Sequence, residues 1–330
     1  MKLLYVVQRY GDDIVGGSEA ACRQFAEALT NAGHSVEVIT SCARSYVTWE
    51  DSYEEGTTDI NGVLVHRLSV PEPRKPERFG PTDQWLMSEN SSPLRFEHER
   101  WARIMGPDIR GFRTWMIDNA HRFDAAIFMT YLYSTATSGI PAIAGRIPVV
   151  FQPTAHDEPP LRIPLFEATF RLADAFMFFT PEERTVVEER FRFDPVGKVV
   201  GIGIELNPPC AESGDFRNFF DLQDDPYLIY VGRLDPMKGV KQLCEFFIEL
   251  KNQYPSSLKL VIIPPGFDPK SGSVSPKQPI ISPVANLGRN FIFCSSEPYF
   301  QIGYITNELC TEAVERKPES HRSNSCMIKP

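Results

Sequence analysis

The start of the chain constrains the fold most, because a strand-like run, a helical stripe and a second strand-like run follow one another within 40 residues. Residues 2–7 are almost entirely aliphatic or aromatic, and residues 34–40 alternate in the manner of a strand. The segment between them carries apolar residues at helical spacing, at Ala21, Cys22, Phe25 and Leu29. This strand–loop–helix–strand order is typical of the opening of a doubly wound parallel sheet.

The same alternation continues for about 200 residues. Short apolar runs typical of buried parallel strands occupy residues 63–68, 125–129, 149–151, 175–179 and 198–201. Helical segments are predicted at 95–121, 160–173 and 181–191. The proline-rich segment 71–93 is predicted to form an irregular loop. We therefore predict an α/β fold with a complete N-terminal Rossmann-like domain over residues 1–204.

A second unit of the same kind is predicted after a break in the pattern. Residues 205–225 lose periodicity and are interpreted as a linker. Residues 226–263 then read as strand, loop, helix and strand, the beginning of a second Rossmann-like domain. Residues 264–330 are rich in Pro and Ser and show no apolar stripe, so we expect a divergent, irregular and poorly ordered tail. The second domain is thus expected to stop early.

Two glycines lie between the first strand and the first helix. Gly16 and Gly17 let backbone amides approach a ligand closely, and the helix N-terminus behind them favours an anion. The alternative interpretation is a simple loop-to-helix turn with Ser18 as the N-cap. Taken alone, the residues favour the turn. The G-x-G-x-x-G pattern of dinucleotide-binding proteins is absent from this loop.

A polar segment, TAHDEPP at residues 154–160, follows the run at 149–151. Polar residues at the carboxyl end of a parallel strand face the ligand crevice. His156 is therefore a candidate catalytic residue that would hydrogen-bond a sugar hydroxyl or meet a developing charge. The alternative is a structural histidine paired with Asp157 or with the backbone, and the residues leave both interpretations open.

The segment GRLDPMKG at residues 232–239 lies between a strand and a helix. Arg233 and Lys238 stand five positions apart, flanked by glycines, at the helix N-terminus. Two cations and the positive end of the helix dipole suit a diphosphate and would neutralise the charge on a departing nucleoside diphosphate. A solvated basic loop would explain the charges but not their position, so phosphate binding is the prediction.

Together these segments resemble family four glycosyltransferases of the GT-B fold (glycosyl transferase group 1 type) over residues 1–263. GGSEAACRQFAEALTNAGHSVEVIT, TAHDEPP, TPEER, VVGIGIE and YLIYVGRLDPMKGVKQL carry the resemblance. It implies two facing Rossmann-like domains and transfer of a sugar from a nucleotide sugar to a hydroxyl of a sugar, lipid or other acceptor. It further implies a retaining reaction without a metal or other cofactor, the nucleotide sugar being a co-substrate.

Residue by residue, the resemblance places Gly16 and Gly17 in the cleft near donor phosphate and acceptor. His156 would lie beside the transferred sugar, and Arg233 and Lys238 would hold the diphosphate. The family also carries two Glu eight positions apart later in the second domain, and no Glu pair of that spacing follows residue 226. We therefore expect impaired activity in a chain of the hexosyltransferase class.

Three other functions are possible for a chain with these segments. A catalytically inactive fragment that at most binds a ligand or partner is the main alternative, because the Glu pair is missing. A nicotinamide-dependent oxidoreductase lacks its glycine fingerprint. A two-domain binding protein of the hinge type would not explain the GRLDPMKG segment.

Composition bears on partners and location. The formal charge is −9, which argues against nucleic-acid binding because counterion release needs a basic face. The seven Cys include no C-x-x-C pair, and we infer a reducing compartment. The short apolar start does not resemble a signal peptide, and no run reaches the roughly 18 apolar residues of a membrane span. A cytoplasmic protein, with a peripheral contact to the inner membrane face allowed, is the expectation; oligomeric state has no signal.

Overall fold

The computed structural model describes most of the chain up to residue 263 and three short strands beyond it. The described residues are 1–14, 16–88, 93–203, 213–232, 238–263, 267–268, 273–274 and 291–293. The chain divides into two compact units, Met1–Glu205 and Leu206–Pro330.

The first unit is built on an eight-stranded sheet in the order β3-β4-β2-β1-β5-β6-β7-β8. Its strands are β1 (Lys2–Val6), β2 (Ser35–Ser41), β3 (Gly56–Ile60), β4 (Val63–Leu68), β5 (Ala125–Met129), β6 (Val149–Gln152), β7 (Ala175–Phe178) and β8 (Gly197–Val199). Every neighbouring pair is parallel except β3 and β4, which form an antiparallel hairpin. The doubly wound parallel sheet predicted from the alternating pattern is confirmed, and the edge strand β3 is an addition to it.

The helices alternate with these strands as expected of crossover connections. They are α1 (Gly17–Asn31), α2 (Pro76–Leu86), α3 (Arg95–Met105), α4 (Phe112–Asn119), α5 (Ser134–Ile143), α6 (Pro164–Arg171) and α7 (Pro181–Phe191), with short 3-10 turns η1 (Ala120–Arg122) and η2 (Pro159–Arg162). The expectation of an irregular loop over 71–93 is wrong for α2. This helix begins with Pro76 in its first turn, where proline is tolerated, and buries Leu86 at its end.

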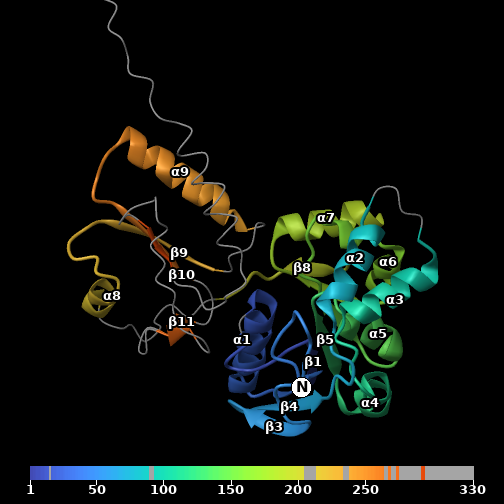
Figure 1. The fold of residues 1–330 in the computed structure, drawn as a ribbon. Helices are drawn as coiled ribbons and strands as arrows, with labels where there is room; N and C mark the ends of the chain where they lie inside the picture. The colour runs from blue at the N-terminus through green and yellow to red at the C-terminus, as the bar shows by residue number, and fades with distance from the viewer. Residues whose placement is uncertain are drawn as a thin grey trace, which may run out of the picture. The chain divides into compact units, whose positions relative to one another are not determined.

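Alternate side chains of the central strands enter two separate cores. On β1, Leu4 and Val6 join the larger core under α3 to α7, whereas Leu3 and Tyr5 join the smaller core under α1. In Figure 1, α1 lies on one side of the sheet, and α3, α4, α5 and α6 gather on the other. Burial on both faces explains why the strands read as continuous apolar runs.

The second unit contains a three-stranded parallel sheet in the order β13-β10-β9. Its elements are α8 (Ser213–Phe219), β9 (Tyr227–Val231), α9 (Val240–Gln253), β10 (Lys259–Ile263) and β13 (Phe291–Phe293), with an antiparallel pair β11 (Phe267–Asp268) and β12 (Ser273–Val274). The strand–helix–strand unit predicted for 226–263 is present. α8 lies inside the segment interpreted as a linker, and β11, β12 and β13 lie inside the segment expected to be irregular.

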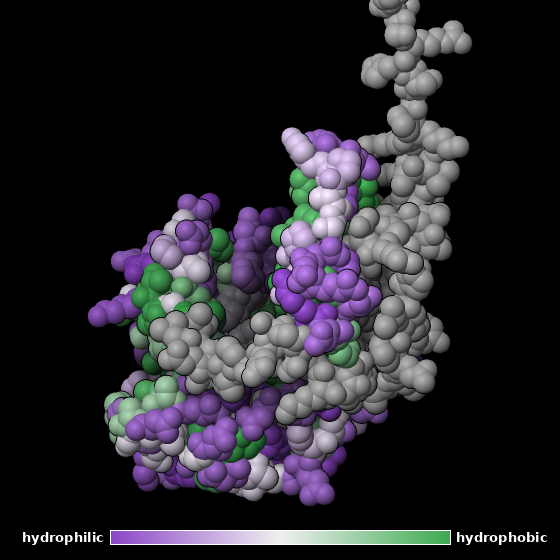
Figure 2. Space-filling model, turned by 90° about the vertical axis from the view of Figure 1, so that its left-hand side faces the viewer, coloured by the Kyte–Doolittle hydropathy of each residue, from purple (hydrophilic) through white to green (hydrophobic). Residues whose placement is uncertain are grey.

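No helix within the described ranges is long and apolar enough to cross a membrane. Among the residues that are coloured in Figure 2, hydrophilic ones predominate on the face shown, and the hydrophobic ones form small patches.

Candidate functional site

The strand order brings the loops of interest to one edge of the first unit's sheet. β1, β5, β6 and β7 are successive parallel neighbours, so the loops that follow them leave from the same edge. The winding reverses at β1, because β2 and β4 lie on one side of it and β5 to β8 on the other. In open α/β sheets, ligands bind at the carboxyl ends of the strands beside such a switch point.

Gly16 and Gly17 lie where the loop after β1 enters α1. Gly16 is the N-cap, and its carbonyl accepts a hydrogen bond from the Ala20 amide at 2.9 Å. The cap therefore lies two residues before Ser18, the cap that the turn interpretation had favoured. A Cβ on Gly16 would collide with the Glu19 carboxylate, whereas one on Gly17 would meet no neighbouring atom within 4 Å. Gly16 is thus needed for close packing, and Gly17 leaves room in front of the helix N-terminus, where an anion is favoured.

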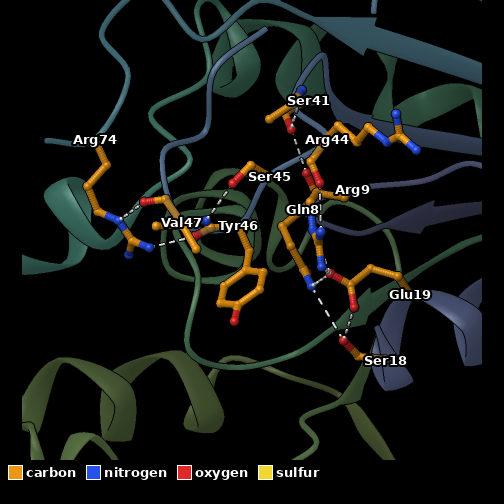
Figure 3. A network of polar contacts seen from close by, with 11 residues as sticks. Gln8, Arg9, Ser18, Glu19, Ser41, Arg44, Ser45, Tyr46, Val47 and Arg74 are labelled. Atoms are coloured by element: carbon orange, nitrogen blue, oxygen red, sulfur yellow. Dashed lines mark hydrogen bonds and ion pairs between the residues drawn. The ribbon is translucent and has the colours of Figure 1, made fainter. Parts of the chain in front are cut away.

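A buried ion pair, which the sequence analysis did not anticipate, lies next to Gly16. Figure 3 shows its two side chains, Arg9 and Glu19, pointing toward each other. The side chains of Arg9 and Glu19 are 6% and 5% exposed, and Arg9 Nε donates to Glu19 Oε1 at 2.9 Å. Gln8 Nε2 donates to the same oxygen at 2.9 Å, and the Ser18 hydroxyl donates to Oε2 at 2.9 Å. A buried carboxylate needs such a full set of donors, and together they tie the loop after β1 to the first turn of α1.

The loop after β2 extends this network away from the glycines. Arg9 Nη1 donates to the Arg44 carbonyl at 2.7 Å, and the Arg9 guanidinium lies 5.2 Å from the centre of the Tyr46 ring. On the far side of the loop, Arg74 Nε donates to the Val47 carbonyl at 2.7 Å, and its Nη2 donates to the Tyr46 carbonyl (Figure 3). Burial lowers the pKa of Arg74. Two arginines therefore hold the loop from both sides by its backbone oxygens.

The loop after β6 carries His156. The backbone of this loop turns sharply two residues after β6 ends, because Thr154 has a φ of +52°. Thr130, at the end of the neighbouring β5, likewise has a φ of +68°. A β-branched residue in this region is strained by about 1–3 kcal/mol, and such strain collects at functional sites.

The His156 side chain itself is exposed. Asp157, the partner proposed for a structural histidine, instead lies 3.6 Å from an Arg162 nitrogen. No hydrogen bond to the His156 ring is formed by any residue in the described part of the chain. The ring is therefore available to a ligand at the switch-point edge.

Glu183, on the first turn of α7, is a buried carboxylate that the sequence analysis did not single out. Its Oε1 accepts from the Ala155 amide at 2.9 Å, and its Oε2 accepts from the Phe179 amide at 2.7 Å. Burial raises the pKa of Glu183, and the amides of Phe179 and Ala155 together with nearby His156 act in the opposite direction. Glu183 thus joins the loop after β7 to the loop that carries His156.

The second unit places Lys238 directly before the N-cap of α9. Gly239 is that N-cap, with a φ of +68°, a conformation that glycine adopts without strain. Lys238 is exposed. Arg233 lies outside the described residues. Among the residues that the structure describes, no group of three or more His, Cys, Asp or Glu side chains has the arrangement of a metal site.

Sequence comparison decides the family. Residues 16–202 match the model of the glycosyl transferase 4-like domain, more than half of the chain. The chain belongs to this family. The match covers the two glycines, the His156 loop and Glu183. A search of curated proteins finds no match.

Solved structures agree on the GT-B fold of this glycosyl transferase 4-like chain. It is similar to a sucrose-phosphate synthase from Thermosynechococcus elongatus, with 17% identity and a TM-score of 0.56 over 90% of this chain and 70% of that one. It is also similar to a UDP-forming α,α-trehalose-phosphate synthase from Burkholderia vietnamiensis, with 13% identity and a TM-score of 0.51 over 80% of this chain and 64% of that one. At such identities the likeness shows the fold alone.

Within the family domain, the structure brings the predicted residues Gly16, Gly17 and His156 to one edge of one sheet. It leaves Lys238 in a separate unit. The residues missed by the sequence analysis are buried carboxylates and their donors. A signal existed for Glu183, because Thr180 followed by Glu at the third helical position is a helix-start pattern.

Proposed function

We propose that this chain transfers a sugar from a nucleoside-diphosphate sugar to an acceptor hydroxyl. The observation that carries the proposal is the edge at the β1–β5 switch point. There, a Cβ on Gly17 at the N-terminus of α1 would meet no atom within 4 Å, the His156 side chain is exposed, and both residues belong to a glycosyl transferase 4-like domain. Such an edge suits a phosphorylated sugar, because the helix end favours the phosphate and the imidazole can hydrogen-bond a hydroxyl.

In the proposed reaction the acceptor oxygen forms a bond to the anomeric carbon while the bond from that carbon to the diphosphate oxygen breaks. Negative charge grows on the leaving diphosphate. Arg233 and Lys238 are proposed to stabilise that charge, together with the N-terminus of α9. Since these cations would neutralise the charge that a divalent metal would otherwise neutralise, we propose a metal-independent reaction. Retention of configuration is proposed from the family resemblance. A cytoplasmic location is proposed from the cysteine pattern.

His156 is proposed to hydrogen-bond a hydroxyl of the transferred sugar. Gly17 is proposed to leave the space in which the donor phosphate or acceptor approaches α1. A UDP-forming synthase is among the structures with this fold, so uridine diphosphate is the first nucleotide to test, with guanosine diphosphate beside it.

Calorimetric titration of the full chain with each diphosphate tests the donor site. We expect saturable binding that weakens about 10- to 100-fold in Arg233→Ala and in Lys238→Ala, the effect of removing one charge-assisted hydrogen bond. Lys241→Ala is the matched control, because Lys241 is on α9 and pairs with Glu245 at 3.8 Å. Equal affinities in all four proteins would refute the assignment of the diphosphate site.

A transfer assay with the nucleotide sugar of the bound base tests His156. We expect His156→Ala to lower kcat about 10²-fold or more. His121→Ala should leave kcat unchanged, because His121 is an exposed residue of the turn η1 before β5. A second candidate function is donor binding without transfer, favoured by the missing Glu pair after residue 226. Diphosphate binding without turnover of any nucleotide sugar would establish that candidate instead.

A further inference from the structure

The loop at residues 154–158 is held on both sides of His156 although the His156 side chain is exposed. The anchor on its amino-terminal side is Glu183, whose carboxylate accepts from the amide of Ala155, the residue before His156. Ala155 is itself buried, with 2% of its surface exposed. The backbone that enters His156 is therefore fixed to α7, an element 25 residues further along the chain.

The anchor on the carboxyl-terminal side is Tyr131, in the loop after β5. Its hydroxyl donates to Glu158 Oε1 at 2.6 Å, and the Glu158 amide donates to the His156 carbonyl at 2.8 Å. The Tyr131 ring is almost fully buried and packs edge-on against Phe166, 4.8 Å between ring centres. The backbone that leaves His156 is thus tied to the loop that follows β5, the strand next to β6 in the sheet.

The geometry of Glu183 differs from that of a helix cap. The cap of α7 is already supplied by Thr180, whose hydroxyl accepts from the Glu183 amide at 3.1 Å. A Glu at this position in a capping box would return to the N-cap amide of its own helix. Glu183 instead uses one oxygen for Phe179, before the cap, and the other for Ala155 on a different loop. Its second oxygen therefore serves the loop of His156 and not the helix.

We infer that Glu183 and Tyr131 are positioning residues for His156, an inference that rests on the proposed function of His156 in sugar transfer. Neither side chain is expected to touch the sugar. Glu183 holds the Ala155 amide directly, and Tyr131 acts through Glu158, whose amide donates to the His156 carbonyl. The imidazole therefore keeps one place at the switch-point edge. Displacing a catalytic group by about 1 Å can cost about 100-fold in rate.

Three single variants separate positioning from general stability. Glu183→Gln keeps the size of the side chain but turns an NH2 group toward an amide donor that needs an acceptor. Tyr131→Phe keeps the buried ring and removes only the donor to Glu158. Glu182→Gln is the matched control, because Glu182 is the preceding residue of the same helix turn and is exposed.

The first measurement needs no substrate. The six histidines of the full chain are labelled with ¹³C in the ring, and the His156 signal is identified by its loss in His156→Ala. We expect the His156 signal to move in Glu183→Gln and in Tyr131→Phe, while the His121 signal and all signals of Glu182→Gln stay in place. An unmoved His156 signal in both variants would overturn the inference. If Glu183→Gln does not fold, Tyr131→Phe decides alone.

The second measurement is a double-mutant cycle in the transfer assay. Glu183→Gln is expected to lower kcat about 10- to 100-fold with KM changed less than about threefold. The same substitution should lower kcat less than about twofold further when His156 is already Ala, because there is then no imidazole to position. A full effect in the His156→Ala background would mean that Glu183 acts otherwise, and would overturn the inference. A wild-type chain that transfers no sugar refutes the proposed function, while the histidine signals still decide the positioning.

Discussion

Removing the carboxylate of Glu19 is the sharpest test of the polar network next to Gly16. Glu19→Ala takes away the acceptor of Arg9 Nε and of Gln8 Nε2, and it leaves a guanidinium that is 6% exposed without its counter-charge. Breaking a buried ion pair from one side costs about 3–5 kcal/mol. The Arg44 carbonyl and the Tyr46 ring still contact Arg9, so the lower end of that range is expected.

The assay is urea unfolding followed by tryptophan fluorescence. All four Trp of the chain, at 49, 85, 101 and 115, belong to the first unit, so the signal reports on that unit. With a slope of about 2–3 kcal/mol per M, the midpoint should fall by about 1–2 M in Glu19→Ala.

The matched control is Glu27→Ala on the same helix. Glu27 is paired with Arg23 at 3.3 Å, and both side chains of this pair are over 20% exposed, so about 0–1 kcal/mol is expected. A double variant, Arg9→Met with Glu19→Met, should recover most of the loss because no buried charge remains. Equal midpoints for Glu19→Ala and Glu27→Ala would refute the reasoning.

Further predictions concern the same edge and the cores beneath it. In Gly16→Ala the new Cβ displaces the Glu19 carboxylate, so the urea midpoint should fall about as much as in Glu19→Ala. Gly17→Ala should change the free energy of unfolding by less than about 0.5 kcal/mol, because a Cβ there meets no neighbouring atom. The same substitution should weaken diphosphate binding only if the diphosphate contacts this glycine. Gln152→Leu should leave the melting temperature equal or higher, since neither polar atom of this buried side chain has a partner among the described residues. Burial raises the pKa values of Tyr5 and Tyr10 above those of the unfolded chain. Their contribution to the stability of the folded state should therefore be complete below about pH 10 and should fall as the pH rises further. Urea midpoints that stay constant from about pH 8 to 11.5 would contradict this.

The parallel sheet was predictable from the sequence because its strands are buried on both faces. Such strands appear as uninterrupted apolar runs, and β5 and β6 lie where the runs at 125–129 and 149–151 predicted them. Length and composition separate these runs from the amphipathic helices between them. The fold class therefore follows from local patterns alone, without any knowledge of which strands are neighbours.

Elements with weaker patterns were missed for physical reasons. β3 is exposed along most of its length, so its side chains carry no apolar signal. The turn after β3 did carry a sequence signal, because Asn-Gly is typical of a two-residue hairpin turn. Asn61 and Gly62 have the φ values of such a turn, +55° and +82°. In α2, prolines suggested a loop, yet Pro76 lies in the first turn, and the hydrogen bond from Trp101 Nε1 to Asp83 at 2.9 Å attaches the helix to α3.

Only the glycines and the histidine of the candidate site were predictable from the sequence. The hydrogen bonds that hold the histidine loop join loops that follow different strands. Glycines and a histidine can be found one by one, by their position after an apolar run. The acceptor of the Ala155 amide lies 28 residues away, and the only local sign of Glu183 was a helix start after Thr180. That acceptor becomes predictable once β6 and β7 are known to be neighbours, because parallel strands bring the loops after them to the same edge. In a chain of this family, a buried Glu at the third position of the helix after β7 should therefore be examined first as a support for the histidine loop after β6, and only then as a helix cap.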